Sequence, residues 1–236
     1  MEPAPIGPSR ELVVEDAVRL AWLARLFGRG IAQYVRLVVR TARFSGDPIN
    51  QGQVIFAVWH ESNLAVAVAA VRLRQDARIV SFSTRRFRGV VMNTMLDALD
   101  GGAVTLPDPG ARSRAEAASV ARAMAAVGRS GRSLMVSCDG PEGPYRVAKP
   151  GVLIVARESG LPVQPLALAS RPLLRLTRRW DRMLLPLPFG RIRLEQGRIL
   201  RVAPRQRIKP VLAELQAELD RLATLADRRT ATTAKT

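Results

Sequence analysis

The sequence predicts an α/β protein with a mostly parallel central sheet flanked by helices, an N-terminal amphipathic helix and a C-terminal helix. Short apolar runs alternate with helical patterns from residue 53 onward, which is the rhythm of βαβ units. Apolar residues recur at helical spacing near both ends of the chain, in residues 20–38 and 209–226. The length of 236 residues with 47% apolar content is enough for one domain with a full core.

The expected strands and helices alternate along the chain, with turn residues between them. Strands are expected at 53–59, 77–83, 103–106, 133–138, 163–169, 191–195 and 198–202. Helices are expected at 62–74, 86–99, 113–127, 152–159 and 209–226. Three segments follow from this pattern: an N-terminal docking or capping segment at 1–48, an α/β domain at 49–226 and a disordered polar tail at 227–236.

The first helix, expected at residues 20–38, has an apolar side that spans about 120° and a basic side opposite it. The apolar side contains Leu20, Leu23, Phe27, Ile31, Tyr34, Val35 and Val38, and the basic side contains Arg25, Arg29, Arg36 and Arg40. Two interpretations stay open. The helix either packs on the core with a solvated basic side, or lies on an anionic lipid surface, and both hold if it sits at the rim of the domain.

The charge balance favours anionic partners. Lys and Arg number 37 against 20 acidic residues, giving a net charge of +17, so nucleic acid, anionic lipid and phosphorylated substrates all fit. Aromatic residues make up only 5% of the chain and do not alternate with basic ones, which argues against a nucleic-acid-binding protein.

The single cysteine, Cys138, excludes an intrachain disulfide, and with one histidine we expect no metal site and no cofactor. We expect neither a secretory signal nor a membrane-spanning segment.

His60, the only histidine, stands where the first apolar strand ends and a helix begins. Ligands bind at the carboxyl ends of strands in open α/β sheets, and helix N-termini favour anions. A second candidate is the loop at 139–151, which follows another apolar strand and is rich in glycine and proline. Arg146 and Lys149 supply cations suited to phosphate, although the loop could be only a rigid connection. Cys138, just before it, is expected to be a buried and inert thiol.

Three separated sequence blocks together resemble the lysophospholipid acyltransferase superfamily, and in particular an uncharacterised bacterial branch of it. The blocks are Trp59-His60 after a strand, Asp139-Gly140-Pro141-Glu142-Gly143-Pro144 running into Ala148-Lys149-Pro150-Gly151, and Trp180-Asp181 followed by Leu185-Pro186-Leu187-Pro188-Phe189-Gly190. The resemblance covers residues 53–202 with the blocks in order.

The resemblance implies transfer of a fatty acyl chain from an acyl-CoA or acyl carrier protein thioester to a hydroxyl of a lysophospholipid or related lipid precursor. His60 would be the general base. The block Asp139-Gly140-Pro141 matches the part that helps hold the phosphorylated acceptor, and charge and spacing add Arg146 and Lys149. We also expect a monomer that is peripheral on the cytoplasmic face of the cell membrane.

Two departures from the family pattern bear on the site. The usual Asp five places after the histidine is Ala65 here, so another group must orient the imidazole. Glu61 should project about 100° away, whereas Asn63 could orient the ring without charge. Asp139 could converge from a neighbouring strand end and is the preferred substitute, unless it only caps its own loop as an Asx turn.

The second departure concerns the family's phosphate-binding arginine after the strand at 103–106. Pro107, Asp108 and Pro109 stand there instead, so Arg112 or Arg114 would supply that cation from further along. A catalytically weakened lipid-binding member of the same fold is the main alternative function, and the retained His60 speaks against it. A nucleic-acid-binding protein is a weaker alternative.

Overall fold

The computed structural model describes residues 9–46, 52–72, 79–83, 86–106, 114–140 and 143–232. The described strands are β1 (Arg43–Gly46), β2 (Ile55–Val58), β3 (Ile79–Ser83), β4 (Gly102–Thr105), β5 (Ser133–Ser137), β6 (Val163–Arg175) and β7 (Leu184–Gln196). The described helices are α1 (Ser9–Thr41), α2 (Asn63–Arg72), α3 (Phe87–Ala98), α4 (Arg114–Arg129), α5 (Gly151–Ser159) and α6 (Ile208–Thr232), with a short 3₁₀ helix η1 (His60–Ser62).

The strands described form one seven-stranded sheet in the order β1-β7-β6-β2-β5-β3-β4. Each neighbouring pair is parallel except the hairpin β6–β7, which is antiparallel. The predicted fold class, a mostly parallel sheet flanked by helices with a helix at each end of the chain, is confirmed. Because β2 and β5 lie side by side and parallel, with Val58 opposite Ser137, their carboxyl ends open at the same edge of the sheet.

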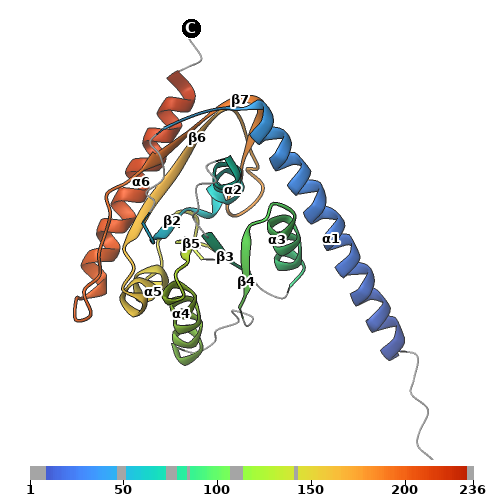
Figure 1. Cartoon of the computed structure of the whole chain (residues 1–236), viewed down its shortest axis with the longest axis horizontal. Helices are drawn as coiled ribbons and strands as arrows, with labels where there is room; N and C mark the ends of the chain where they lie inside the picture. The colour runs from blue at the N-terminus through green and yellow to red at the C-terminus, as the bar shows by residue number, and fades with distance from the viewer. Residues whose placement is uncertain are drawn as a thin grey trace, which may run out of the picture.

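Helices cover both faces of the sheet (Figure 1). Successive residues of a strand point to opposite faces, so Phe56 and Val58 of β2 pack with α1, α2 and α3, while Ile55 and Ala57 pack with α4, α5 and α6. All four β2 residues are buried, as expected of a central parallel strand. This double cover fixes the end of β2, where His60 begins η1.

Within the described residues, no helix is long and apolar enough to cross a membrane.

Helix α1 packs on the domain mainly through small residues between positions 24 and 32, rather than through the large apolar residues that the sequence pattern suggested. Its buried positions include Ala24, Gly28 and Ala32, whereas Leu20 and Phe27 are 54% and 58% exposed. A Cβ at Gly28 would lie 2.6 Å from the Val91 carbonyl oxygen, so the glycine permits close contact with α3. Large apolar side chains cannot occupy such a tight helix contact. The core-packing interpretation therefore holds at Val35 and Val38 but not at Leu20, Leu23 and Phe27, which are exposed.

One observed strand was not expected, and two strand predictions need correction. The four-residue strand β1 was not expected, because it is short, mostly exposed and follows directly on a long helix. Residues 191–195 belong to the longer β7, whose first half is too rich in proline to suggest a strand. Residues 198–202 form no strand and contribute a single bridge between Leu200 and Val163.

The prediction of a disordered tail from residue 227 is wrong up to Thr232, because α6 continues to that residue. Two polar residues of the extension have partners on other elements. Asp227 forms ion pairs with Arg146 and Arg175, and Arg229 forms one with Glu195 on β7. Composition alone could not reveal these partners, which fix a polar segment to the domain.

Candidate active site

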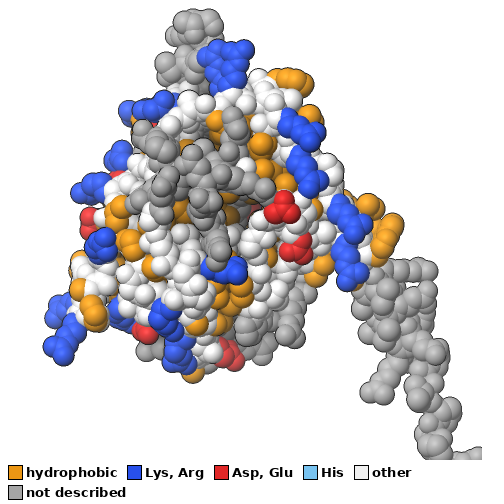
Figure 2. Space-filling view, viewed as in Figure 1, with side chains coloured by type: hydrophobic (Ala, Val, Ile, Leu, Met, Phe, Trp, Pro, Cys, Tyr) orange, Lys and Arg blue, Asp and Glu red, His pale blue; other side chains and the backbone are white. Residues whose placement is uncertain are grey.

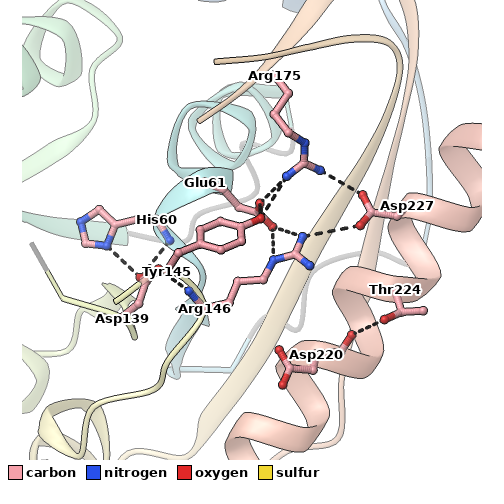
Figure 3. Close-up of polar contacts among 9 residues, drawn as sticks. All are labelled: His60, Glu61, Asp139, Tyr145, Arg146, Arg175, Asp220, Thr224 and Asp227. Atoms are coloured by element: carbon pink, nitrogen blue, oxygen red, sulfur yellow. Dashed lines mark hydrogen bonds and ion pairs between the residues drawn. The ribbon is translucent and has the colours of Figure 1, made fainter. Parts of the chain in front are cut away.

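His60 and Asp139 meet at the carboxyl ends of β2 and β5 (Figure 3). Oδ1 of Asp139 lies 2.9 Å from Nδ1 of the imidazole and also accepts a hydrogen bond of 3.1 Å from the His60 backbone N–H. The Asp139 side chain is fully buried, while that of His60 is 21% exposed. The predicted contact between these residues is confirmed. Oδ2 also accepts a longer hydrogen bond of 3.4 Å from the Arg146 backbone N–H, so Asp139 holds its own loop as well, although this contact spans seven residues and is not an Asx turn.

This arrangement assigns different tasks to the two ring nitrogens. A carboxylate is acceptor-only, so the hydrogen of Nδ1 is the one that Asp139 can accept. Nε2 is then the nitrogen with a free lone pair, as a general base requires. Ala65, where the resemblance places an orienting Asp, is completely buried in the core between α2 and the sheet. Asp139 therefore makes the contact that a residue at position 65 does not.

The connection between β6 and β7 covers the imidazole from another side. The Trp180 ring lies 5.2 Å from the His60 ring, between centroids, at a tilt of 55°. Trp180 also fills the space over Gly143, where a Cβ would lie 2.9 Å from an indole carbon and where φ is +75°. The sequence block at 180–181 carried the resemblance but was given no role, and its place beside His60 is a finding of the structure.

Asp181 is a second carboxylate near His60. It is 3% exposed and accepts hydrogen bonds of 2.8 and 2.7 Å from the Nε and Nη2 of Arg179. Burial by itself would raise the pKa of Asp181, but the hydrogen bonds and charge of Arg179, with a contribution from His60, hold that pKa below its ordinary value. Asp181 is thus a fixed negative charge that is neutralised by its own arginine.

Glu61 points away from the imidazole, as predicted, into a cluster of donors. Its carboxylate is 2% exposed and accepts hydrogen bonds from the Tyr145 hydroxyl and from the guanidiniums of Arg146 and Arg175. Burial, followed by the hydrogen bond with Glu61, raises the pKa of Tyr145 to about 12, so this hydroxyl remains a donor at neutral pH. No role was predicted from the sequence for Arg175 or for the Tyr145 side chain, although Tyr145 lies within the candidate loop at 139–151.

The two predicted phosphate-binding cations, Arg146 and Lys149, have different neighbours. The Arg146 guanidinium pairs with Glu61 and with Asp227. Lys149 lies across Gly140, where a Cβ would come within 2.8 Å of the lysine Nζ and where φ is +69°. Gly140 therefore permits both the turn and the approach of the ammonium group. Pro141 and Arg112 lie outside the described residues, and so does the side chain of Arg114, the first residue of α4.

Two further expectations concern residues beside the site. Asn63 accepts a hydrogen bond of 2.8 Å from the Ser137 hydroxyl, so its side-chain oxygen is held by β5. Cys138 is buried, as expected, and burial followed by the charge of Asp139 raises the pKa of its thiol. Such a thiol is not a nucleophile at neutral pH.

In the described part of the chain, no group of three or more His, Cys, Asp or Glu side chains could hold a metal ion.

Comparison with known proteins defines the class of the fold. No family model matches the chain. The structure is similar to the crystal structure of the 1-acyl-sn-glycerophosphate (LPA) acyltransferase PlsC from Thermotoga maritima, with a TM-score of 0.53 and 13% sequence identity. The similarity covers 84% of this chain and 79% of that one. The chain therefore has an acyltransferase-like fold.

A relative by sequence is an uncharacterised protein of Rickettsia prowazekii (strain Madrid E), which is 21% identical over 149 residues. The match covers 63% of this chain and 64% of that protein, so it spans less than two thirds of the relative's length.

Proposed function

We propose that the protein is an O-acyltransferase that moves a fatty acyl chain from an acyl-CoA or acyl carrier protein thioester to a hydroxyl of a lysophospholipid or related lipid precursor. The observation that carries this proposal is the 2.9 Å contact between His60 Nδ1 and the buried Asp139 carboxylate, at the strand ends of an acyltransferase-like fold. A histidine held this way is suited to remove a proton from a hydroxyl.

In the proposed reaction, His60 Nε2 takes the proton of the acceptor hydroxyl while its oxygen attacks the thioester carbonyl. A C–O bond forms, the C–S bond breaks, and the proton passes to the departing thiolate. Asp139 keeps the proton of Nδ1 in place and stabilises the imidazolium that forms between the two transfers. No covalent acyl-enzyme and no cofactor is needed, because the base and the activated acyl group together supply the chemistry.

Lys149 is the better supported of the proposed phosphate contacts. Its ammonium has no ion pair with any carboxylate that the structure describes, and it lies over the Gly140 backbone next to Asp139. Arg146 has two carboxylate partners, so its charge is already compensated. Gly140 and Pro141 would shape the acceptor pocket, with Arg114 as a further cation. A free cation suits a phosphorylated acceptor.

The acceptor and the chain length can be identified in cells. We expect a strain that lacks the gene to accumulate one lysolipid and to lose the matching acylated product. Lipid mass spectrometry of the deleted strain, of the complemented strain and of one complemented with the His60→Ala gene gives the comparison. Restoration by the His60→Ala gene would argue against acyl transfer and favour the catalytically weakened lipid-binding alternative.

We also propose that the protein docks on an anionic membrane through α1. Three apolar residues that face outward, Leu26, Phe27 and Leu37, are 52%, 58% and 46% exposed. Arg25, Arg29 and Arg40 are exposed on the neighbouring side of the helix, and Figure 2 shows a row of basic side chains along α1. Apolar and guanidinium sides next to each other suit the boundary between acyl chains and anionic headgroups.

Removal of these charges tests the docking proposal. We expect Arg25→Gln/Arg29→Gln/Arg40→Gln to weaken binding to anionic vesicles on the order of 100-fold, since each basic residue near such a surface contributes about 1 kcal/mol. The matched control is Arg201→Gln/Arg205→Gln/Arg207→Gln, which removes three exposed arginines ahead of α6. Sedimentation with vesicles at increasing salt measures both triple variants. An equal loss in both would assign the effect to net charge, and tighter binding to DNA would favour the nucleic-acid alternative.

Phe189 extends the apolar side of α1. It is 81% exposed and has a φ of +62°, a conformation that side chains rarely adopt. Its backbone N–H donates a 3.0 Å hydrogen bond to the Thr41 hydroxyl, which in turn donates to the Leu37 carbonyl oxygen. Phe189 therefore lies at the last turn of α1, which also connects to the exposed Leu37 through its backbone. An aromatic ring held out from the surface suits insertion among lipid chains.

We expect Phe189→Ser to lower vesicle binding by about 10-fold or more, because burial of a Phe side chain is worth about 1.5 to 3 kcal/mol. Ile199→Ser is the control, since Ile199 is also exposed, at 42%, and the residue before it, Arg198, donates a hydrogen bond to Glu218 of α6. Vesicle sedimentation with thermal unfolding measures both variants. Unchanged binding of Phe189→Ser would remove this residue from the docking surface.

A further inference from the structure

The buried Glu61 carboxylate joins three segments of the site. The Tyr145 hydroxyl donates a 2.6 Å hydrogen bond to Oε2, and Arg175 Nη1 donates one of 2.8 Å to the same oxygen. Arg146 donates to Oε1 from Nε, at 2.9 Å, and from Nη2. The loop after β5 and the end of β6 are thereby tied to η1, which begins with His60. Glu61 is too enclosed to take a proton from a substrate, so any role it has is indirect.

Asp227 closes the cluster from the outside. Its carboxylate lies 3.2 Å from Arg175 Nη2 and 3.6 Å from Arg146 Nη2, and it is 49% exposed. The two guanidiniums thus lie between an inner carboxylate, Glu61, and an outer one, Asp227 (Figure 3). Two positive and two negative charges balance within the cluster, so it is not a site for an additional anion. The outer carboxylate comes from α6, far along the chain from His60.

The same cluster supports the partner of the imidazole. Arg146 has a φ of +52°, and its backbone N–H donates to Asp139 Oδ2 at 3.4 Å. Gln216 of α6 accepts from the Ala148 N–H at 2.7 Å and donates to the Arg146 carbonyl oxygen at 3.0 Å. The segment that carries Arg146 is thus held by its side chain, through Glu61, and by its backbone, through α6.

We propose that Glu61 and Asp227 are positioning residues for the His60–Asp139 pair, and that the C-terminal part of α6 belongs to the active site for this reason. This inference rests on the proposed acyl transfer. The inner carboxylate fixes η1 and with it the His60 backbone. The outer carboxylate keeps Arg146 and Arg175 in the geometry that Glu61 needs, and the Arg146 backbone in turn holds Asp139.

The test compares Asp227→Asn with Glu214→Gln. Glu214 is the matched control, because it is on the same helix, is 47% exposed and has one ion pair of 3.6 Å, with Arg198. We expect Asp227→Asn to lower kcat by about 5- to 20-fold with little change in KM, since misplacement of a base affects the chemical step and not substrate binding. Asp227→Glu, which keeps the charge, should restore most of the loss. Glu61→Gln should have the larger effect.

A second readout does not depend on activity. His60 is the only histidine in the chain, so protein labelled with ¹⁵N-histidine gives ring signals from one residue. We expect these signals to shift or broaden in Asp227→Asn, to recover in Asp227→Glu and to stay unchanged in Glu214→Gln. Unchanged signals and kcat in Asp227→Asn would overturn the proposal, as would equal changes in Glu214→Gln. If the wild-type protein transfers no acyl group, the proposed function fails while the NMR comparison still decides the positioning role.

Discussion

Replacement of His60 by Ala is expected to lower kcat for acyl transfer by about 10³-fold or more while the protein stays folded. The loss is large because the acceptor hydroxyl then has no base in contact with it, and general-base catalysis contributes about 10²- to 10⁴-fold. The fold should survive because His60 follows a strand end, is partly exposed and is not part of the packed core. Initial rates with a thioester donor and a lysophospholipid, together with thermal unfolding, measure the two effects.

Two outcomes of the His60→Ala experiment would contradict the proposed role of His60 as the base. Equal rates for the variant and the wild-type protein would show that His60 has no part in the reaction. Loss of activity together with a large fall in the unfolding temperature would instead make His60 a structural residue. Lys209→Ala, which removes an exposed side chain at the start of α6, serves as the control for handling and purity.

Replacement of Asp139 by Asn is expected to lower kcat by about 10²- to 10⁴-fold, as loss of the orienting carboxylate does in serine protease triads. An amide can donate a hydrogen to Nδ1, which favours the ring tautomer with the proton on Nε2 and removes the free lone pair. Asp139 is fully buried and lies 2.9 Å from His60 Nδ1, so water cannot replace the lost carboxylate as the partner of the imidazole. We expect Glu61→Gln to lower kcat less than Asp139→Asn does.

The tautomer can be read directly. In the wild-type protein at a pH where the imidazole is neutral, ¹⁵N signals of the single histidine should show the proton on Nδ1. In Asp139→Asn the population should move toward the proton on Nε2. A wild-type protein with its proton on Nε2, or an Asp139→Asn variant with unchanged turnover, would contradict the orienting role of Asp139.

The contact between His60 and Asp139 was predictable from the sequence because it depends on topology. Both residues directly follow apolar strands, and the alternation of strands and helices predicts that those strands are parallel. Parallel strands end at the same edge of a sheet, so the two side chains had to lie on one edge. The β2–β5 pairing then brings them into direct contact. Because Ala65 stands where the family pattern has an orienting Asp, another carboxylate was needed to orient the imidazole.

The other partners of the site were not predictable in this way. Trp180 lies in a connection between antiparallel strands, and Arg175 is the last residue of β6, which extends six residues beyond the strand expected at 163–169. Asp227 lies in a polar segment whose composition is typical of a disordered tail. Each depends on contacts between side chains distant in sequence. Likewise, the packing side of α1 follows from a close contact with α3, which favours Gly28 over the larger Phe27 next to it.

The most direct measurement is product formation by the purified protein. Wild-type protein is incubated with palmitoyl-CoA or palmitoyl acyl carrier protein and a panel of lysophospholipids, including lysophosphatidate, on anionic vesicles. We expect one acceptor to gain an ester-linked palmitoyl chain, detected by mass spectrometry, with one free thiol released per ester formed. Specific binding of a lysophospholipid without ester or free thiol, from either donor, would contradict acyl transfer and leave a lipid-binding protein with an acyltransferase-like fold.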